Sequence, residues 1–391
     1  MRDLPPLGGG KLSHHAHVVG WGKYIPQRVL TNDDLSRMVD TSDEWIRTRT
    51  GIRERHIAKD GETTASMAVQ AARQALEVAR FSPSQLDLII VTTLTPDYLF
   101  PATACLVQDI LGATHAAAFD LLAGCSGFIY GLNIAAHLLS SGAYQTALVI
   151  GSETLSRITD WSDRATCVVF GDGAGAVILQ AGENEGGVLA TTLGSDGSGG
   201  DVLRVPAGGS YAPASHQTVE EGLHFIQMKG REVFRFAVNV IPTATCEVLE
   251  KAGLTLDDLD LLIPHQANQR IIEAAARFLA LPPEAVYSNL EWYGNTSTAS
   301  IPIALSEAVE EGRIQTGDLV VCVGFGAGLT WGAAAIRWTR PLPTPVPRWQ
   351  RILRRLHYPL AALRSRLRRL LRWLSAFWTR NGLNGRRGRK K

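Results

Sequence analysis

Short apolar runs alternate with stretches of helical hydrophobic spacing along the first half of the chain. The apolar runs predict strands at 17–24, 86–91, 116–122, 146–151 and 167–179. Apolar Met67, Ala71 and Ala75 have near-helical spacing and predict a helix over 63–80. The segment 126–141 is almost wholly apolar, which predicts a helix buried on most of its sides.

The same order of elements recurs in the second half. A predicted helix over 234–252 is followed by a polar connection and an apolar strand at 259–263, as in the stretch 81–95. The glycine-rich segment 324–338 likewise resembles 171–180. Two similarities in the same order predict an internal duplication.

This repeat divides the chain into three parts. We expect an N-terminal half over 17–180, a C-terminal half over 181–338 and a separate tail over 339–391. Because each half alternates strands and helices, both should be α/β units packed around mixed sheets. A chain of 391 residues suits this architecture better than one small core.

The tail has a pattern of its own. Its alternating prolines predict a stiff linker and are Pro341, Pro343, Pro345 and Pro347. Pro359 should separate a short apolar segment from a longer amphipathic helix. The short segment carries Trp349, Ile352, Leu353 and Leu356. At ~100° per residue, the large apolar residues of the longer helix fall on one arc. They are Leu360, Leu363, Leu367, Leu370, Leu371, Leu374, Phe377 and Trp378.

Charge separates the tail from the rest of the chain. Sixteen of the 39 basic residues lie beyond residue 339, and none of the 37 acidic residues does. Residues 1–339 therefore hold 23 basic against 37 acidic residues, a formal charge of −14, although the whole chain has +2. An acidic body thus carries a strongly basic tail.

Composition excludes several protein classes. No apolar run reaches the ~18 residues of a transmembrane helix, and the N-terminus lacks the apolar core of a signal peptide, so we expect a cytoplasmic protein. The five cysteines are scattered, without CxxC spacing. This argues against a disulfide framework or a zinc site and for a reducing compartment.

Candidate chemistry centres on the stretch LLAGCSGFIYGL, residues 121–132, where a predicted strand turns into a helix at Cys125. The first turn of a helix carries unpaired N–H groups and the positive end of the macrodipole. A thiol at this position should ionise more easily, and the thiolate is the nucleophile. A buried structural cysteine remains the alternative.

Three further residues have two interpretations each. His265 directly follows a predicted strand of an α/β unit, a usual site position, but an isolated histidine there also suits a core role. Asn295 lies in a Gly-Asn-Thr turn, where Thr296 or Ser297 should cap the following helix. Trp45 lies among arginines and could stack on a base, or simply anchor a surface helix.

Taken together, the motifs resemble β-ketoacyl-acyl-carrier-protein synthase III, a thiolase-fold condensing enzyme. The matching stretches cover 17–338 in order and are TSDEWIRTRTGIRERHI (41–57), TPDYLFPATACLVQ (95–108), GCSGFIYGL (124–132), FGDGAGAVIL (170–179), PHQANQR (264–270), GNTSTASIPIAL (294–305) and GFGAGLTWGAA (324–334). The resemblance implies two duplicated α/β halves in a layered α-β-α-β-α core.

The resemblance also implies roles for particular residues. The catalytic triad would be Cys125, His265 and Asn295, with an oxyanion hole made by the backbone N–H groups of Cys125 and Ala327. Coenzyme A would be held by Trp45, Arg49 and Arg164. Phe325 would lie beside the cysteine, and Phe100 would reach the acyl pocket of a partner subunit. The carrier-protein contact strip would be Gln266, Ala267, Asn268, Gln269 and Arg270.

The implied reaction starts fatty acid synthesis. An acyl group moves from acyl-coenzyme A to Cys125, and malonyl-acyl-carrier protein then loses carbon dioxide and condenses with it. No metal or cofactor is implied; coenzyme A enters only as the thioester substrate. The family is homodimeric. A related ketosynthase of polyketide or secondary lipid synthesis and a non-catalytic thiolase-fold scaffold are the alternatives.

The family does not account for the tail. A basic helix with Leu, Phe and Trp on one face is typical of an interfacial anchor, so residues 349–380 predict peripheral contact with an anionic membrane surface. Binding to the acidic body, docking of an acidic carrier protein and an extension without function are the alternatives. Nucleic acid is disfavoured because it would leave the apolar stripe without a partner.

Overall fold

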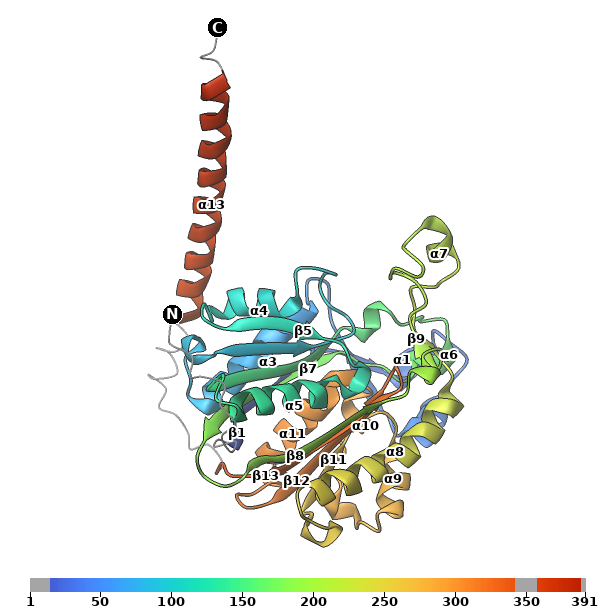
Figure 1. Ribbon diagram of the computed structural model, residues 1–391. Coiled ribbons are helices and arrows are strands. Elements are labelled where there is room, and N and C mark those ends of the chain that lie inside the picture. Colours follow the sequence, from blue (N-terminus) through green and yellow to red (C-terminus); the bar gives the residue numbers. More distant parts are fainter. Residues whose placement is uncertain (1–14, 342–356, 388–391) are drawn as a thin grey trace.

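The computed structural model of the chain describes residues 15–341 and 357–387, and in the second range the side chains of 358–375. Two sheets lie face to face, with one helical layer between them and one on each outer face (Figure 1). This is the layered helix–sheet–helix–sheet–helix order that the family resemblance implied.

The first sheet has the strand order β1-β7-β6-β4-β5. Its strands are β1 (His15–Tyr24), β7 (Gly173–Gly182), β6 (Thr146–Glu153), β4 (Leu88–Thr92) and β5 (Ala117–Leu121). Strand β4 pairs in parallel with β5 and β6, whereas β7 is antiparallel to both β1 and β6. Helices α3 (Thr64–Ala79) and α4 (Thr103–Leu111) cover its outer face.

The second sheet repeats four of these strands. Its order is β8-β13-β12-β11, with β8 (Gly187–Ser195), β13 (Thr330–Arg337), β12 (Leu319–Gly326) and β11 (Leu261–Pro264). Again one pair is parallel, β11 with β12, and the next two are antiparallel. Helices α8 (Gly230–Lys251) and α9 (Gln269–Phe278) cover the outer face. The strand order thus has the predicted repeat, while the boundary at residue 180 stays a prediction.

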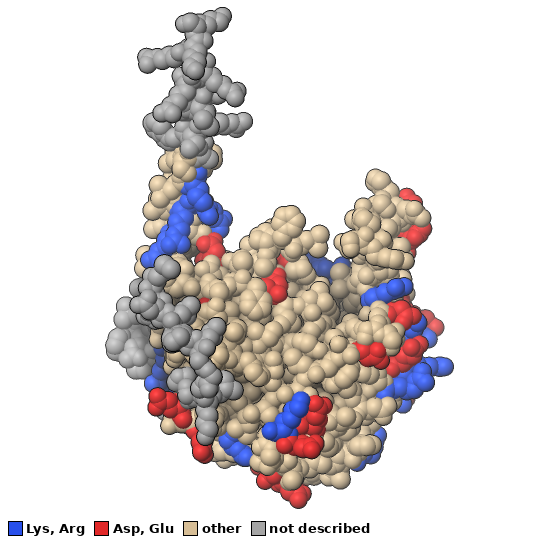
Figure 2. Space-filling view, viewed as in Figure 1, with Lys and Arg blue, Asp and Glu red and all other residues tan. Residues whose placement is uncertain are grey.

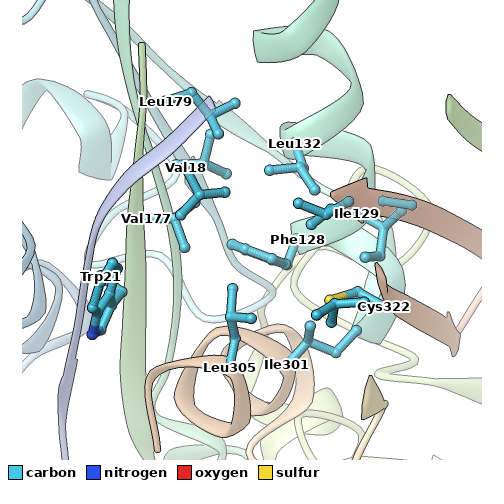
Figure 3. Packing of buried hydrophobic residues seen from close by; sticks show 14 of the residues in the cluster. Val18, Trp21, Phe128, Ile129, Leu132, Val177, Leu179, Ile301, Leu305 and Cys322 are labelled. Atoms are coloured by element: carbon cyan, nitrogen blue, oxygen red, sulfur yellow. The ribbon is translucent and has the colours of Figure 1, made fainter. Parts of the chain in front are cut away.

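Between the sheets lie α5 (Gly127–Ser140) and α11 (Ser300–Glu310). Phe128 and Leu132 of α5 meet Ile301 and Leu305 of α11 in one buried cluster that also receives side chains from both sheets (Figure 3). Trp21 and Trp338 belong to this cluster and contact each other, with ring centroids 5.3 Å apart. The almost wholly apolar sequence of α5 is explained by this position, because both of its sides face a sheet.

The remaining described elements are short helices and strands that lie outside the two large sheets. They are β2 (Arg28–Thr31), α1 (Asn32–Ser36), α2 (Asp43–Thr50), β3 (Glu54–Ile57), α6 (Arg164–Cys167), β9 (Leu203–Arg204), α7 (His216–Glu220), β10 (Gln227–Met228) and α10 (Leu290–Tyr293).

Local sequence signals were correct at some ends of elements and wrong at others. The helix predicted over 63–80 is α3, and Thr63 is its N-cap, since its side chain accepts from the Ser66 N–H. The strand expected from residue 167 starts only at Gly173, because Cys167 ends the short helix α6. The predicted side-chain cap of α11 is also wrong, because a 3-10 turn over Ser297–Ala299 leads into that helix.

In the described part of the tail there is one helix, α13 (His357–Arg387). Its first turns pack on α3 and α4, and its remainder leaves the body (Figure 1). Pro359 lies in its first turn, where a proline does not interrupt hydrogen bonding. Trp349, Ile352, Leu353, Leu356 and the linker prolines 343, 345 and 347 lie outside the described residues, as do the side chains of Phe377 and Trp378. Among the described helices, none has both the length and the apolar composition to cross a bilayer.

Candidate active site

The two halves enclose a cavity of about 950 Å³. Cys125 enters it from the first half, and His265 and Asn295 enter it from the second. Further lining residues include Trp45, Arg49, Arg164, Phe170, Leu203, Met228, Arg231, Phe234, Arg235, Ala267, Asn268, Arg270 and Phe325. Residues as far apart in sequence as Trp45 and Phe325 thus share one site, with an apolar interior and arginines among its lining.

Cys125 lies at the strand-to-helix turn that the sequence predicts. It belongs to a 3-10 turn over Gly124–Ser126 that runs directly into α5. Gly124 has φ +57°, and a Cβ there would lie 2.7 Å from the Ala327 nitrogen. Only glycine therefore lets the loop after β12 approach the cysteine turn this closely. The approach brings the Ala327 backbone beside Cys125, as an oxyanion hole requires.

The protonation of Cys125 differs from our expectation. Burial raises the pKa of the Cys125 thiol to about 12; a hydrogen bond with Ser297 acts against this shift, and the charge of Glu153 adds to it. The helix start therefore does not leave a free thiolate in the cavity. The thiol is neutral at rest, and its proton has to leave during acyl transfer.

His265 is held by its backbone and by one ring nitrogen. Its N–H donates to the Val323 carbonyl at 2.8 Å, and Nδ1 lies 2.6 Å from Ser300 Oγ. The Gln266 N–H donates to the same Oγ at 3.4 Å, which leaves the serine hydroxyl hydrogen for Nδ1. This assigns the remaining ring proton to Nε2. Burial lowers the pKa of His265 to about 3, so the ring is a neutral donor.

Asn295 offers a second neutral donor. Its Oδ1 accepts from the Ser297 N–H at 2.8 Å, and its backbone bridges to Phe170 of the first half. Because the side-chain oxygen is occupied, the Nδ2 amide is the end left to donate. His265 and Asn295 can therefore both hydrogen-bond one oxyanion in the cavity without adding a charge.

Sequence reasoning missed a buried carboxyl group beside the cysteine. Glu153 ends β6, is fully buried, and accepts from Thr95 Oγ1 at 2.6 Å, from the Leu94 N–H at 3.1 Å and from Ser297 Oγ at 3.1 Å. Burial raises the pKa of Glu153 to about 7, although these hydrogen bonds lower it. A glutamate at the end of an otherwise apolar strand was the available signal.

The two phenylalanines named from the sequence have different positions. Phe325 is buried in the cavity wall, edge-on to His265 with ring centroids 5.2 Å apart. Phe100 is 86% exposed and does not line the cavity of its own chain. It lies next to exposed Tyr98 and Leu99, in the segment before α4.

The residues expected to hold coenzyme A lie together on the cavity lining. The Arg164 guanidinium lies over the Trp45 ring, 4.9 Å from its centroid, and donates to the Asp40 carbonyl at 2.9 Å. Arg49 is exposed on the same lining. A planar cation over an indole forms a stacking platform for another flat ring.

The carrier-protein strip needs a correction. Gln266 is buried and donates to the Pro264 carbonyl at 2.6 Å while accepting from the Asn289 N–H at 3.0 Å. Ala267 is buried as well. The Gln266 side chain is thus held inside the fold, whereas Ala267 lines the cavity. Of the five residues, Asn268, Gln269 and Arg270 are accessible, and the first of these caps α9.

Family models and individual relatives of this chain all point to one protein family. A model of the 3-oxoacyl-(acyl-carrier-protein) synthase III family matches residues 119–197, and a model of its C-terminal part matches 249–338. The β-ketoacyl-(acyl-carrier-protein) synthase III of Caldanaerobacter subterraneus is 57% identical over 325 residues, 83% of this chain and 98% of that protein. The protein of that name from Symbiobacterium thermophilum is 58% identical over 323 residues, again 83% and 98%.

Solved structures agree. The crystal structure of 3-oxoacyl-(acyl-carrier-protein) synthase III from Aquifex aeolicus is 51% identical, with TM-score 0.77 over 83% of this chain and all of that chain. The priming β-ketosynthase of the R1128 polyketide pathway is 38% identical, with TM-score 0.80 over 87% of this chain and all of that one. The chain therefore belongs to the β-ketoacyl-acyl-carrier-protein synthase III family of condensing acyltransferases, and its fold is thiolase-like.

Proposed function

We propose that this enzyme condenses an acyl-coenzyme A primer with malonyl-acyl-carrier protein, with loss of carbon dioxide, to give a 3-oxoacyl-acyl-carrier protein. The observation that carries the proposal is the meeting of Cys125, His265 and Asn295 around one cavity. One thiol and two neutral donors are what the two half-reactions of such a condensation require.

In the first half-reaction, Cys125 Sγ attacks the thioester carbonyl of the primer. The C–S bond to coenzyme A breaks, and the proton of the Cys125 thiol ends on the departing sulfur. The reaction exchanges one thioester for another, so the barrier lies in forming the thiolate and the oxyanion. The backbone N–H groups of Cys125 and Ala327 would stabilise that oxyanion, and one such donor is worth ~2.7–4 kcal/mol.

In the second half-reaction, the malonyl carboxylate leaves as carbon dioxide and its electron pair passes to the thioester oxygen. His265 Nε2–H and Asn295 Nδ2–H would donate to this enolate oxygen. The enolate carbon then attacks the acyl-Cys125 carbonyl and expels the thiolate, which takes up a proton. Neutral donors suit the step because they do not hold the negative carboxylate in place.

The cavity lining supports a nucleotide-bearing thioester. Trp45 and Arg164 would stack on the adenine, and Arg49 would neutralise a phosphate. Arg231, Arg235 and Arg270 also line the cavity and could bind the phosphate of the carrier-protein arm. Asn268, Gln269 and Arg270 would form the accessible part of the carrier-protein contact.

A homodimer is part of this proposal. Strand β5 is an edge of the first sheet, and Leu122 directly after it is 74% exposed. With Tyr98, Leu99 and Phe100 it provides apolar surface beside an unpaired strand edge, where a second copy could pair. Phe100, which lies outside its own cavity, would then reach the partner's acyl site.

The deciding experiment follows acylation and condensation on one sample. Intact-protein mass spectrometry should show one acyl group after incubation with an acyl-coenzyme A, and its loss when malonyl-acyl-carrier protein is added, with formation of the 3-oxoacyl product. Cys125→Ser should remain unmodified, and Cys246→Ser, which changes an exposed cysteine, should behave like the native enzyme. Normal acylation of Cys125→Ser would overturn the assignment.

The similarity to a polyketide priming ketosynthase keeps that second function open. A polyketide priming function predicts the same acyl-Cys125 intermediate but a different preferred carrier protein. Competition between a fatty-acid carrier protein and a polyketide carrier protein, with one primer, separates the two functions. A non-catalytic scaffold would give no acyl-Cys125 at all.

A further inference from the structure

Helix α13 is amphipathic, and the structure reverses the usual orientation of its two faces. A surface helix normally turns its apolar stripe towards the protein core. In α13 the described residues that touch the body are instead Tyr358, Ala361, Ser365 and Arg369, and the leucines face away.

The contact with the body is made by one narrow face. Ser365 Oγ donates to Asp109 Oδ2 of α4 at 2.6 Å, and Arg369 Nη2 donates to the same oxygen at 2.8 Å. The Tyr358 ring lies 4.3 Å from the guanidinium of Arg73 on α3. Ala361 completes this face and is 7% exposed. With steps of three, four and four residues, these side chains follow one side of the helix.

The leucine row occupies the opposite side. It consists of Leu360, Leu363, Leu367, Leu370 and Leu371, each between 51% and 64% exposed. At ~100° per residue its centre lies roughly 180° from the face that contacts Asp109. These leucines therefore do not contact the acidic body, because the helix is attached to the body by its opposite side.

Arginines flank the row. Arg364 and Arg368 follow it on one side and Arg366 on the other, and all three are exposed. Figure 2 shows the basic side chains gathered along α13, in contrast to the mixed charges of the body. From residue 340 to the end of the sequence there are sixteen basic and no acidic residues.

We propose that α13 docks the enzyme on an anionic lipid bilayer, with the leucine row in the boundary between headgroups and acyl chains and the flanking arginines on lipid phosphates. An apolar stripe bordered by cations is the pattern of interfacial helices. Each cation near an anionic leaflet adds to the attraction. Because the body contacts the opposite face, the helix can lie on the membrane without detaching from α4.

Other occupants fit the described surface less well. A second copy of α13 would bring two helices of the same high positive charge together. Nucleic acid would match the arginines but leave five leucines in water. A carrier protein would match the arginines with acidic groups, but an apolar stripe bordered by cations is the pattern of an interfacial helix. The proposal concerns docking only and is independent of the proposed condensation.

Flotation of the full chain with vesicles tests the docking. The protein should float with vesicles of phosphatidylcholine mixed with phosphatidylglycerol, and not with phosphatidylcholine alone. The variant L363S/L367S/L370S should lower binding by at least about tenfold, since it removes the apolar term. R364Q/R366Q/R368Q should lower it and weaken its dependence on salt. Val219→Ser on α7, which changes an exposed apolar residue elsewhere, should bind like the native protein.

Three results would overturn the proposal. The first is native protein found only in the unbound fraction, and the second is equal flotation with neutral vesicles. The third is a leucine variant that binds lipid normally but loses self-association in light scattering or loses carrier-protein binding, which would assign the row to a protein partner. Circular dichroism verifies that each variant keeps its helices, and acyl transfer to soluble substrates should be unchanged in all of them, so failure of docking is distinguishable from failure of the proposed function.

Discussion

Helices α5 and α13 both carry rows of large apolar side chains, yet they lie in opposite environments. In α5, Phe128, Ile129, Leu132 and Leu139 are at most 1% exposed, between two sheets. In α13, the leucine row is more than half exposed. Hydrophobic spacing alone therefore predicts a helix in both places, but not what the apolar side chains will touch.

The two helices differ in how many charged residues they carry, and this explains their different environments. Between Gly127 and Ser140, α5 has no Asp, Glu, Lys or Arg, so it can be covered on both sides. Between 364 and 372, α13 has five arginines, which cannot be buried without partners. Asp109 on the body pairs with one of them, Arg369, so the face of the helix that carries Arg369 meets the body. The apolar row is left outward as a consequence.

Stability should show this contrast most strongly. Phe128→Ala removes a fully buried ring from between the sheets and should cost about 3–5 kcal/mol of unfolding free energy. Leu367→Ala removes a half-exposed side chain on α13 and should cost no more than about 0.5 kcal/mol. Urea unfolding at a constant m-value measures both. Equal losses would mean that the leucine row is covered by protein in solution.

Catalysis should depend on the interior and not on the tail. Asn295→Ala removes one of the two oxyanion donors and should slow decarboxylation and condensation by about 10²–10³. Acylation of Cys125 should change much less, since the other half-reaction uses backbone donors. Single-turnover assays separate the two steps. Asn184→Ala, which changes an exposed asparagine, and L363S/L367S/L370S are the controls and should leave both rates unchanged. Equal slowing of both steps by Asn295→Ala would contradict this division of roles.

The buried carboxyl beside Cys125 should make stability depend on pH. Burial raises the pKa of Glu153 to about 7, above its usual 4.5, so the folded state holds this proton more tightly than the unfolded state. The contribution of Glu153 to the free energy of unfolding is present at low pH. It is lost as pH rises from about 4.5 to about 7, a change on the order of 1–3 kcal/mol.

Glu153→Gln isolates that effect, because its amide stays neutral at every pH. Urea unfolding at about pH 5 and about pH 8 should show a smaller loss of stability on raising the pH for the variant than for the native enzyme. The matched control is Glu185→Gln, which changes an exposed glutamate. An identical pH dependence of Glu153→Gln and native enzyme would show that Glu153 is already ionised in the fold.

How far the sequence predicts the structure depends on the range of the interactions. Helix α3, its Thr63 cap and the turn at Cys125 follow from neighbouring residues, and the repeated strand order follows from repeated motifs. The wrong start of β7 and the wrong cap of α11 lie where glycine-rich and Ser/Thr-rich segments of different halves meet. There, contacts between distant residues override local preferences.

The site follows the same rule. Motifs identified Cys125, His265 and Asn295, but they gave no measure of burial. Burial raises the pKa of the Cys125 thiol instead of lowering it, holds the Gln266 side chain inside the fold, and gives Glu153 its raised pKa. Ser300 was not identified because its hydrogen bond to His265 spans 35 positions along the chain.

The smallest expected effect concerns the joint between the two regions. Asp109→Asn weakens the hydrogen bonds from Ser365 and Arg369, and a partly exposed pair of this kind is worth about 0–1 kcal/mol. Global stability and catalysis should hardly change, but amide hydrogen exchange over 358–375 should become faster while that of α3 and α4 stays the same. Asp257→Asn, at an exposed carboxylate of the second half, is the control. Because the leucine row faces away from Asp109, lipid binding should persist in Asp109→Asn. Loss of binding would mean that the body must hold α13 in place for docking, whereas unchanged exchange would show that the contact with α4 does not position the helix.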